Sequence, residues 1–389
     1  MSFYNLPKIQ FNNGLIKSIE PIFSNNDSIF INKTLSNYLN KIKTEIETCG
    51  SEWDRYKKYT NPYEYIHSGL PHQRFSICKY KPLSRSFYKL IEICKSLSLL
   101  SNLNENACKT YHIAEGPGGF IEAISHMRSN KTDKYYGISL IDDEETVPGW
   151  KKSRQFLNDN SNVIIETGID KRGDIMNNEN LMDCYDRHTG SMDFITADGG
   201  FDFSIDFNKQ ENVSGKLILS QIAFAVAMLK PTKDFVIKFF DTFTKLSIEL
   251  LFLLSNIFTE ITIIKPNTSR CANSEKYVVC KHLKINEIER HRLVLKFNEI
   301  IKKFKNDSDI LLTGILNILI PHYFVIKIEE INAILGQQQI ENIISTLTLI
   351  NSHDQEKIDK FKKNNIVKCI KWCQRFDLPF NKHSYFEGT

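Results

Sequence analysis

Strand-like and helix-like segments alternate along the middle of the sequence, from about residue 80 to residue 284. Stretches in which apolar residues recur at helical spacing, such as GKLILSQIAFAVAMLK, separate most of the strand-like runs. Those runs, short and rich in β-branched and aromatic residues, are YHIAEGPGGF, KYYGISLI, NVIIETGI, MDFITADGG, DFVIKFF, EITIIKP and KYVVCKHL. The alternation predicts an α/β fold, a mostly parallel sheet flanked by helices, with the last two strands in an antiparallel hairpin.

Two segments of different character flank this unit. Residues 1–79 form an N-terminal extension that contains the aromatic and basic stretch EWDRYKKYTNPYEYIHSGLPHQRF. Residues 285–389 lose the strand rhythm, and helical periodicity runs through ILLTGILNILIPHYFVIKIEEINAIL to the last expected helix. We therefore expect three parts: the extension 1–79, an α/β domain 80–284 and a helical C-terminal region 285–389.

The composition is that of a globular protein with reduced thiols. The chain has 389 residues, 41% of them apolar, which is enough to bury a sizeable core. Nine cysteines without a C-x-x-C pair fit free thiols in the cytoplasm better than disulfides or a structural zinc site. The first residues lack a secretory pattern, and the apolar window from Leu246 to Ile264 carries two glutamates, so we expect neither export nor a membrane span.

A glycine-rich turn follows the first predicted strand, at the place where open α/β sheets bind ligands. It reads Glu115, Gly116, Pro117, Gly118, Gly119, Phe120. The turn lacks the Gly-Lys-Ser/Thr ending of a phosphate loop and the G-x-G-x-x-G spacing of a dinucleotide site. Glu115 suits a positively charged ligand, such as the amino group of S-adenosylmethionine, and Gly118 and Gly119 permit a close approach of the backbone. The alternative is a turn that only packs a helix against a strand.

Charged residues stand at other strand ends of the same unit. Asp174 follows the third strand, where an acid accepts from an adenine amino group, and we include its neighbour Ile175 in the expected donor site. Asp198 and Lys238 follow or end later strands, so both are expected to face one crevice. A lysine within VIKFF is costly to bury unless it is paired. A purely structural network of ion pairs is the competing interpretation.

Five motifs, SRSFYKLIEI, AEGPGGF, ADGGFDFS, VIKFFD and SRCANSEKYVV, resemble in this order those of FtsJ-like RNA 2′-O-methyltransferases. The ADGG form is more similar to the mRNA cap-modifying branch of eukaryotes and large cytoplasmic DNA viruses than to the ribosomal branch. The resemblance covers roughly residues 80–284 and implies a Rossmann-like class I methyltransferase sheet with S-adenosylmethionine as donor. It also implies a catalytic tetrad of Lys89, Asp198, Lys238 and Glu275, with Asp198 close to the donor as well.

The resemblance implies methylation of the ribose 2′-OH in the first nucleotides of capped mRNA, without a metal. Lys238 is then the general base, and Asp198 and Glu275 orient the two lysines. Many relatives bind the donor ribose through an acid at the tip of the second strand, which is missing here, so Asp142 or Asp143 is the substitute. Two alternatives stay open: a ribosomal or transfer RNA methyltransferase, and a scaffold that binds RNA without catalysis.

A single-stranded RNA substrate requires a basic and aromatic entrance. The stretch of residues 50–75 is the first candidate, and Trp53 or Tyr56 is expected to sandwich a methylated guanine. Lys151, Lys152 and Arg154 form a second candidate patch. The plainer interpretation is a helix with a solvated face and tyrosines packed on the core.

The C-terminal region is too apolar to be a free tail. Cys369 and Cys373 lie one helical turn apart, but no histidine at suitable spacing joins them, so buried packing is favoured over a metal site. The region is expected to cover the sheet, to form a homo-oligomer or to bind a capping enzyme, and the sequence leaves these three roles open.

Overall fold

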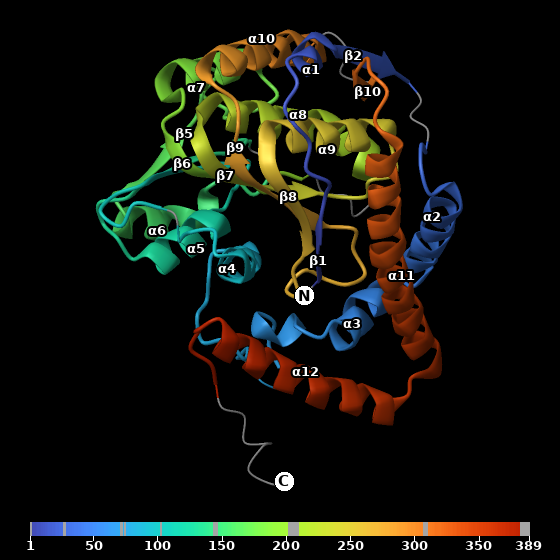
Figure 1. The fold of residues 1–389 in the computed structure, drawn as a ribbon. Helices are drawn as coiled ribbons and strands as arrows, with labels where there is room; N and C mark the ends of the chain where they lie inside the picture. Colours follow the sequence, from blue (N-terminus) through green and yellow to red (C-terminus); the bar gives the residue numbers. More distant parts are fainter. Residues whose placement is uncertain are drawn as a thin grey trace.

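The computed structural model describes residues 2–25, 29–70, 73, 75–101, 103–142, 147–200, 210–305 and 310–381. Within these residues the main sheet has eight strands in the order β1-β8-β9-β7-β6-β3-β4-β5 (Figure 1). Their bounds are Ser2–Asn5 for β1, Lys109–Ile113 for β3, Lys134–Ile138 for β4, Val163–Glu166 for β5, Met192–Ala197 for β6, Leu229–Phe239 for β7, Phe258–Lys265 for β8 and Lys276–Leu283 for β9.

The strand directions agree with the Rossmann-like sheet that the motif resemblance implies. Strands β5, β4, β3, β6 and β7 are parallel, and β9 is antiparallel to both β7 and β8. All seven strands expected from the sequence are present, and the last two form the predicted hairpin. Every residue of β6 is buried, as is typical of a central parallel strand covered on both faces.

Helices cover both faces of the sheet, each over its own hydrophobic core (Figure 1). On one face lie α4 (Ser86–Leu97), α5 (Gly119–Arg128) and α6 (Arg154–Asp159), with the short helix η2 (Lys151–Ser153) before α6. On the other lie α7 (Asn178–His188), α8 (Gln210–Met228), α9 (Lys245–Ile257) and α10 (Glu287–Phe304). The predicted α/β fold is therefore confirmed.

The apolar window from Leu246 to Ile264 forms α9 and most of β8, and nearly all of it is buried in the protein core. Among the described residues, no helix has the length and hydropathy needed to cross a membrane.

Both flanking segments pack on the central unit. Strand β1 extends the main sheet beside β8, and a second sheet pairs β2 (Ile19–Ser24) with β10 (Leu311–Leu316). The helical expectation for residues 311–316 is therefore wrong. The run LLTGIL is too short for a stable helix, Gly314 disfavours one, and Pro321 fixes the helix start at the next residue.

A layer of helices joins the two ends of the chain (Figure 1). From the N-terminal side come α2 (Lys33–Thr48), α3 (Ser51–Thr60) and η1 (Glu64–Ile66), and from the C-terminal side α11 (His322–Ser352) and α12 (Gln355–Arg375). The short helix α1 (Gly14–Lys17) packs on α10 instead. Helices α2 and α3 pack against α11, and α3 and η1 pack against α12.

This packing corrects one expectation about the RNA entrance. Trp53 is 8% exposed and Tyr56 is 4% exposed, so neither ring is free to stack on a guanine. Both belong to the core between α3 and α11, and the Tyr56 hydroxyl lies 2.7 Å from His353 Nδ1. The plainer interpretation, tyrosines packed on the core, holds for Tyr56 and Tyr65. Arg74 lies outside the described residues.

The cysteines are free thiols, and Cys369 and Cys373 are fully buried on the inner face of α12, as predicted from packing. In the part of the chain that the structure describes, no three His, Cys, Asp or Glu side chains are grouped to hold a metal ion.

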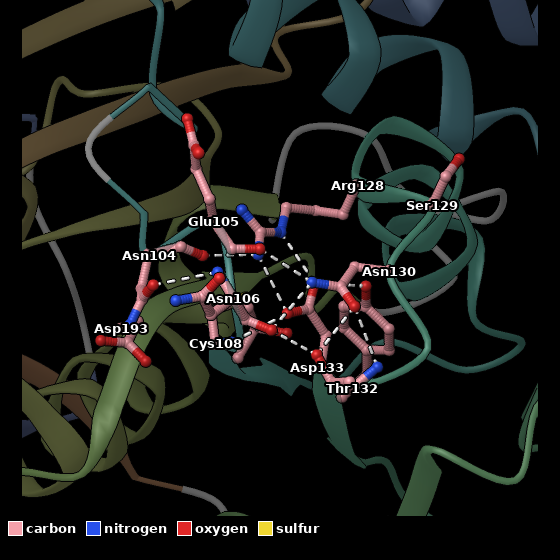
Figure 2. A network of polar contacts seen from close by, with 12 residues as sticks. Asn104, Glu105, Asn106, Cys108, Arg128, Ser129, Asn130, Thr132, Asp133 and Asp193 are labelled. Atoms are coloured by element: carbon pink, nitrogen blue, oxygen red, sulfur yellow. Dashed lines mark hydrogen bonds and ion pairs between the residues drawn. The ribbon is translucent and has the colours of Figure 1, made fainter.

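A polar network fixes α5 at the edge of the sheet where the parallel strands begin (Figure 2). Arg128, in the last turn of α5, donates to both carboxylate oxygens of Asp133, at 2.7 and 2.9 Å. The same carboxylate accepts from the backbone N–H of Cys108 at 2.8 Å. Because this end of α5 is anchored, its other end, which carries the glycine turn, has a fixed position relative to the sheet.

Candidate active site

A cavity of about 640 Å³ opens at the carboxyl ends of the parallel strands. The segments that follow β3, β4 and β6, the stretch between β5 and α7, and the end of β7 all contribute to its wall. This is where the topology of an open α/β sheet creates a crevice. Of the residues predicted from the sequence, Lys89, Glu115, Gly116, Pro117, Asp174, Ile175, Asp198 and Lys238 line it.

The second half of the glycine turn lies at the contact between α5 and the start of α4. Gly118, Gly119 and Phe120 do not belong to the cavity wall. A Cβ on Gly119 would lie 2.3 Å from the hydroxyls of both Ser84 and Ser86, so the missing side chain lets α5 pack against the start of α4. Gly118 has φ +107°, a conformation that favours glycine. The space at Gly119 thus serves helix packing, and a contact of Gly118, Gly119 and Phe120 with a donor stays a prediction.

The missing side chain of Gly116, in contrast, lets the backbone of Gly149 come close beside the cavity. A Cβ there would lie 2.5 Å from the carbonyl oxygen of Gly149, in the segment that also brings Val147 and Pro148 to the wall. Phe120 is buried, with its ring centroid 5.9 Å from that of Tyr277.

The Glu115 carboxylate lies between the cavity and the start of α5. It accepts from the backbone N–H groups of Phe120 and Ile121 at 2.5 and 3.5 Å, close to the positive end of the helix dipole. Burial raises the pKa of Glu115 despite these bonds. A carboxylate has about four acceptor positions, so a cationic ligand group can be bound in addition.

Asp174 and Ile175 line the same cavity. The Asp174 carboxylate accepts from the backbone N–H of Met176 at 2.8 Å, and burial raises its pKa. Asp142, one candidate for a ribose-binding acid, does not belong to the cavity wall and pairs with Arg172 at 2.6 Å. The other candidate, Asp143, lies outside the described residues.

The structure brings Lys238 and Asp198 together at the ends of neighbouring strands. Lys238 Nζ donates to the backbone carbonyl of Asp198 at 2.7 Å and lies 3.3 Å from Asp198 Oδ1. Lys238 is only 9% exposed, so these oxygens replace most of its water. Gly200 completes the site, since a Cβ there would lie 3.1 Å from Lys238 Nζ.

Lys89 and Glu275 form a second, more deeply buried pair, with 2.7 Å between Nζ and Oε1. Lys89 lines the cavity, whereas Glu275 stands behind it and accepts from Ser269 Oγ at 2.7 Å. Burial alone would raise the pKa of Glu275, but the charges of Lys89 and Lys238 outweigh it and hold this pKa well below its usual range. The effect of Lys238 on Glu275 links the two pairs.

Tyr277 connects the pairs physically, and sequence reasoning missed it. It stands opposite Lys238 in the β7–β9 register, and its hydroxyl donates to Asp198 Oδ1 at 2.8 Å. Lys89 Nζ lies 6.0 Å from the centre of its ring. The sequence does contain a signal for Tyr277. Side chains alternate along a strand, so Tyr277, two positions after Glu275, is expected on the same side as Glu275.

Other wall residues were also missed. Ser84 and Arg85 lie just before α4, inside a motif that was recognised only for its lysine, and Ser139 and Leu140 follow β4. The patch of Lys151, Lys152 and Arg154 is exposed and follows directly on the wall segment of Val147 and Pro148. Its contact with RNA stays a prediction.

The arrangement suits proton removal from a hydroxyl group. One amine faces the cavity between a carbonyl and a carboxylate, and a second amine is fixed by an ion pair beside it. Two further carboxyl groups, those of Glu115 and Asp174, lie along the same wall. A bound molecule would thus meet carboxyl groups at one part of the cavity and two amines at another.

Comparisons with known proteins support the motif resemblance. The family model for FtsJ-like methyltransferases matches residues 82–283, just over half of the chain. Cap-specific mRNA (nucleoside-2′-O-)-methyltransferase 2 of Danio rerio is 28% identical over 373 residues, which cover 90% of this chain and 47% of that protein. Cap-specific mRNA (nucleoside-2′-O-)-methyltransferase 1 of Mus musculus is 31% identical over 287 residues, which cover 70% of this chain and 32% of that protein.

The chain spans less than half the length of these curated relatives. Among solved structures, an rRNA methylase from Streptococcus thermophilus matches with 15% identity and a TM-score of 0.32, covering 50% of this chain and 97% of that one.

Proposed function

The chain belongs to the FtsJ-like methyltransferase family, and on this basis we propose that it methylates the ribose 2′-OH of the first nucleotides of capped mRNA. The observation that carries the proposal is the placement of Lys238 and Asp198 on one cavity with the turn at Glu115 to Pro117. The relatives named for cap-specific methylation support the choice of RNA 5′ ends.

The cavity fits S-adenosylmethionine as methyl donor. Its volume of about 640 Å³ lies within the range of small-molecule sites. Glu115 is buried without a cationic partner among the described groups, so a ligand amino group there offsets the cost of its charge. Asp174 and Ile175 are assigned to the adenine end. When bound, the donor supplies a methyl group attached to a positively charged sulfur.

The residues of this chain then have separate tasks. Lys238, once it has lost its own proton, takes the 2′-OH proton while the ribose oxygen attacks the methyl carbon and the carbon–sulfur bond breaks. Asp198 holds Lys238 through its carbonyl and carboxylate. Glu275 fixes Lys89 beside this site, and Lys89 orients the ribose.

The substrate enters as a single strand, because a ribose inside an RNA duplex gives poor access to a crevice. The exposed Lys151, Lys152 and Arg154 are proposed as an entrance contact. Nine free thiols support a reducing compartment, and we assign the protein to the cytoplasm on that ground.

Incubation with labelled donor and matched capped and uncapped transcripts tests this function. Nuclease mapping should place the label on the 2′-oxygen of the first nucleotides of the capped RNA. Equal labelling of both transcripts at an internal position would instead indicate a ribosomal or transfer RNA methyltransferase. Donor binding without transfer to either RNA would indicate a scaffold.

The base assignment is tested separately with Lys238→Ala. This variant should lose transfer and still bind the donor in a calorimetric titration, because the turn at Glu115 to Pro117 is unchanged. Transfer at the wild-type rate would show that Lys238 is not the base.

A further inference from the structure

Helix α12 carries more net positive charge than the chain as a whole. Its 21 residues include seven basic and two acidic side chains, a net charge of +5. The whole chain of 389 residues has a net charge of +4. The rest of the molecule is therefore close to electrically balanced, and α12 stands out from it.

Most of the charge on α12 lies on one side of the helix. Of its six exposed basic residues, five share this side at helical spacing, namely Lys357, Lys360, Lys368, Lys371 and Arg375, whereas Lys363 lies off it. The opposite side is buried and contains Ile358, Ile366, Cys369, Trp372 and Cys373. From the first to the last of the five, the face is about 27 Å long, at 1.5 Å per residue.

These five residues differ from other lysines on the outer helices. Lys362 pairs with Asp359 at 3.0 Å, Lys327 with Glu330 at 2.8 Å, and Lys296 lies 3.9 Å from Glu299. Within the described residues, none of the five forms an ion pair, and no acidic residue stands among them on the same side of α12. A solvated helix usually alternates charges of both signs, so an unpaired face of one sign indicates an anionic partner.

The face is connected to the active site through the loop between β8 and β9. Helix α12 packs on η1, where Glu64 accepts two bonds from Arg270, at 3.0 and 3.2 Å. Arg270 belongs to the loop that ends at Glu275. Its charge also lowers the pKa of Arg85, at the cavity wall, in addition to the effect of burial.

Lys368 supplies a second link. Its charge acts on the thiol of Cys271, the residue after Arg270, where it opposes the rise in pKa that burial causes. Arg85 at the cavity wall, Arg270 with its partner Glu64, and Lys368 on α12 therefore lie along one route from the cavity to the basic face.

We propose that this basic face of α12 binds the phosphates of single-stranded RNA beyond the nucleotide that is methylated. The inference rests on the proposed function and adds a place for the body of the substrate. Lysine ammonium groups contact phosphates as point charges, so binding here is independent of sequence and weakens with salt.

The test compares two triple variants of the full chain. Lys360→Gln, Lys368→Gln and Lys371→Gln together remove three charges from the face. The control removes three exposed charges from α10, at the opposite end of the molecule (Figure 1), by Arg292→Gln, Lys302→Gln and Lys303→Gln. Both sets are exposed, so folding is expected to be unaffected, and circular dichroism checks this.

Binding of a fluorescent 20-nucleotide single-stranded RNA is measured over a range of salt concentrations. The α12 variant should bind about tenfold or more weakly at low salt, and its slope of log K against log salt should be about 2 units shallower, at ~0.7 per lost contact. The α10 control should match the wild type. An α12 variant with wild-type affinity and slope overturns the proposal and leaves an acidic protein as the alternative partner. An equal loss in the α10 control also overturns it.

Kinetics separates this proposal from the proposed function. With a capped RNA of three nucleotides, the α12 variant should keep the wild-type kcat and KM, because the RNA is too short to reach the face. With a capped RNA of 20 nucleotides, its KM should rise about tenfold at unchanged kcat. Loss of transfer with the short RNA contradicts a distant contact. If the wild type methylates neither RNA, the proposed function fails, and the binding measurement still decides the role of α12.

Discussion

Lys89 Nζ lies 2.7 Å from Glu275 Oε1, although 186 positions separate the two residues in the sequence. The pair joins the first helix of the α/β unit to the loop before its last strand. Both side chains are almost fully buried, so each depends on the other for its charge.

Lys89→Met should lower the free energy of unfolding by about 3 kcal/mol or more, since it leaves the Glu275 carboxylate buried without its cation. The double variant Lys89→Met/Glu275→Gln removes both charges and should recover much of this loss. Urea denaturation of the two single variants and the double variant measures the coupling. Additive effects would show that the pair contributes nothing to stability.

Tyr277→Phe removes the hydroxyl that donates to Asp198 and keeps the ring that packs on Phe120. We expect kcat to fall about tenfold, which corresponds to about 1.4 kcal/mol, while donor affinity stays within a factor of two. Tyr65→Phe is the matched control, because the buried Tyr65 hydroxyl has no hydrogen-bond partner among the described residues. If both variants lose activity equally, the bond to Asp198 is not the cause.

Gly119→Ala should destabilise the protein by about 1–3 kcal/mol, because the new methyl group overlaps the hydroxyls of Ser84 and Ser86. Adding Ser84→Ala and Ser86→Ala removes those oxygens and should restore part of the stability. Thermal unfolding of the single and triple variants checks this. No recovery in the triple variant would mean that the backbone of α4, and not the hydroxyls, limits the approach.

The ion pair between Glu64 and Arg270 should make the stability of the protein depend on pH. Its pKa in the folded protein is about 2, below the ordinary value of 4.5, because Arg270 outweighs the effect of burial. The stabilisation is therefore present above pH 4.5 and is lost as the pH falls toward 2. Glu64→Gln should cost about 3 kcal/mol at pH 6, and its difference from the wild type should vanish near pH 2. A difference that stays constant over this range would contradict the ion pair with Arg270.

The sequence was sufficient for the central sheet because its signals are local. Each strand from β3 to β9 is a short apolar run, and the positions of Lys238 and Asp198 followed from the rule that parallel strands end at one edge. Residues 311–316 were assigned wrongly for the opposite reason. Their strand character depends on pairing with β2, almost 300 positions earlier, which no local pattern contains.

Contacts between distant elements explain the remaining differences between the sequence predictions and the structure. The spacing of Trp53 and Tyr56 fits a stacking surface and a buried helix face equally well, and only contact with α11 decides between them. At Gly119 the structure shows a close backbone approach to Ser84 and α4, while contact of this glycine with the donor stays a prediction. The position of Tyr277 opposite Lys238 follows from the pairing of β9 with β7, which the sequence alone does not specify.

The helical layer that carries Trp53 and Tyr56 also sets the order of events during synthesis. Helices α2 and α3 leave the ribosome early, yet their apolar sides have no cover until α11 and α12 have been translated, more than 250 codons later. The sheet from β3 to β9 is complete before that point. Newly made chains therefore expose the tryptophan side of α3 to chaperones for longer than any part of the sheet, and truncation before α11 leaves that exposure permanent.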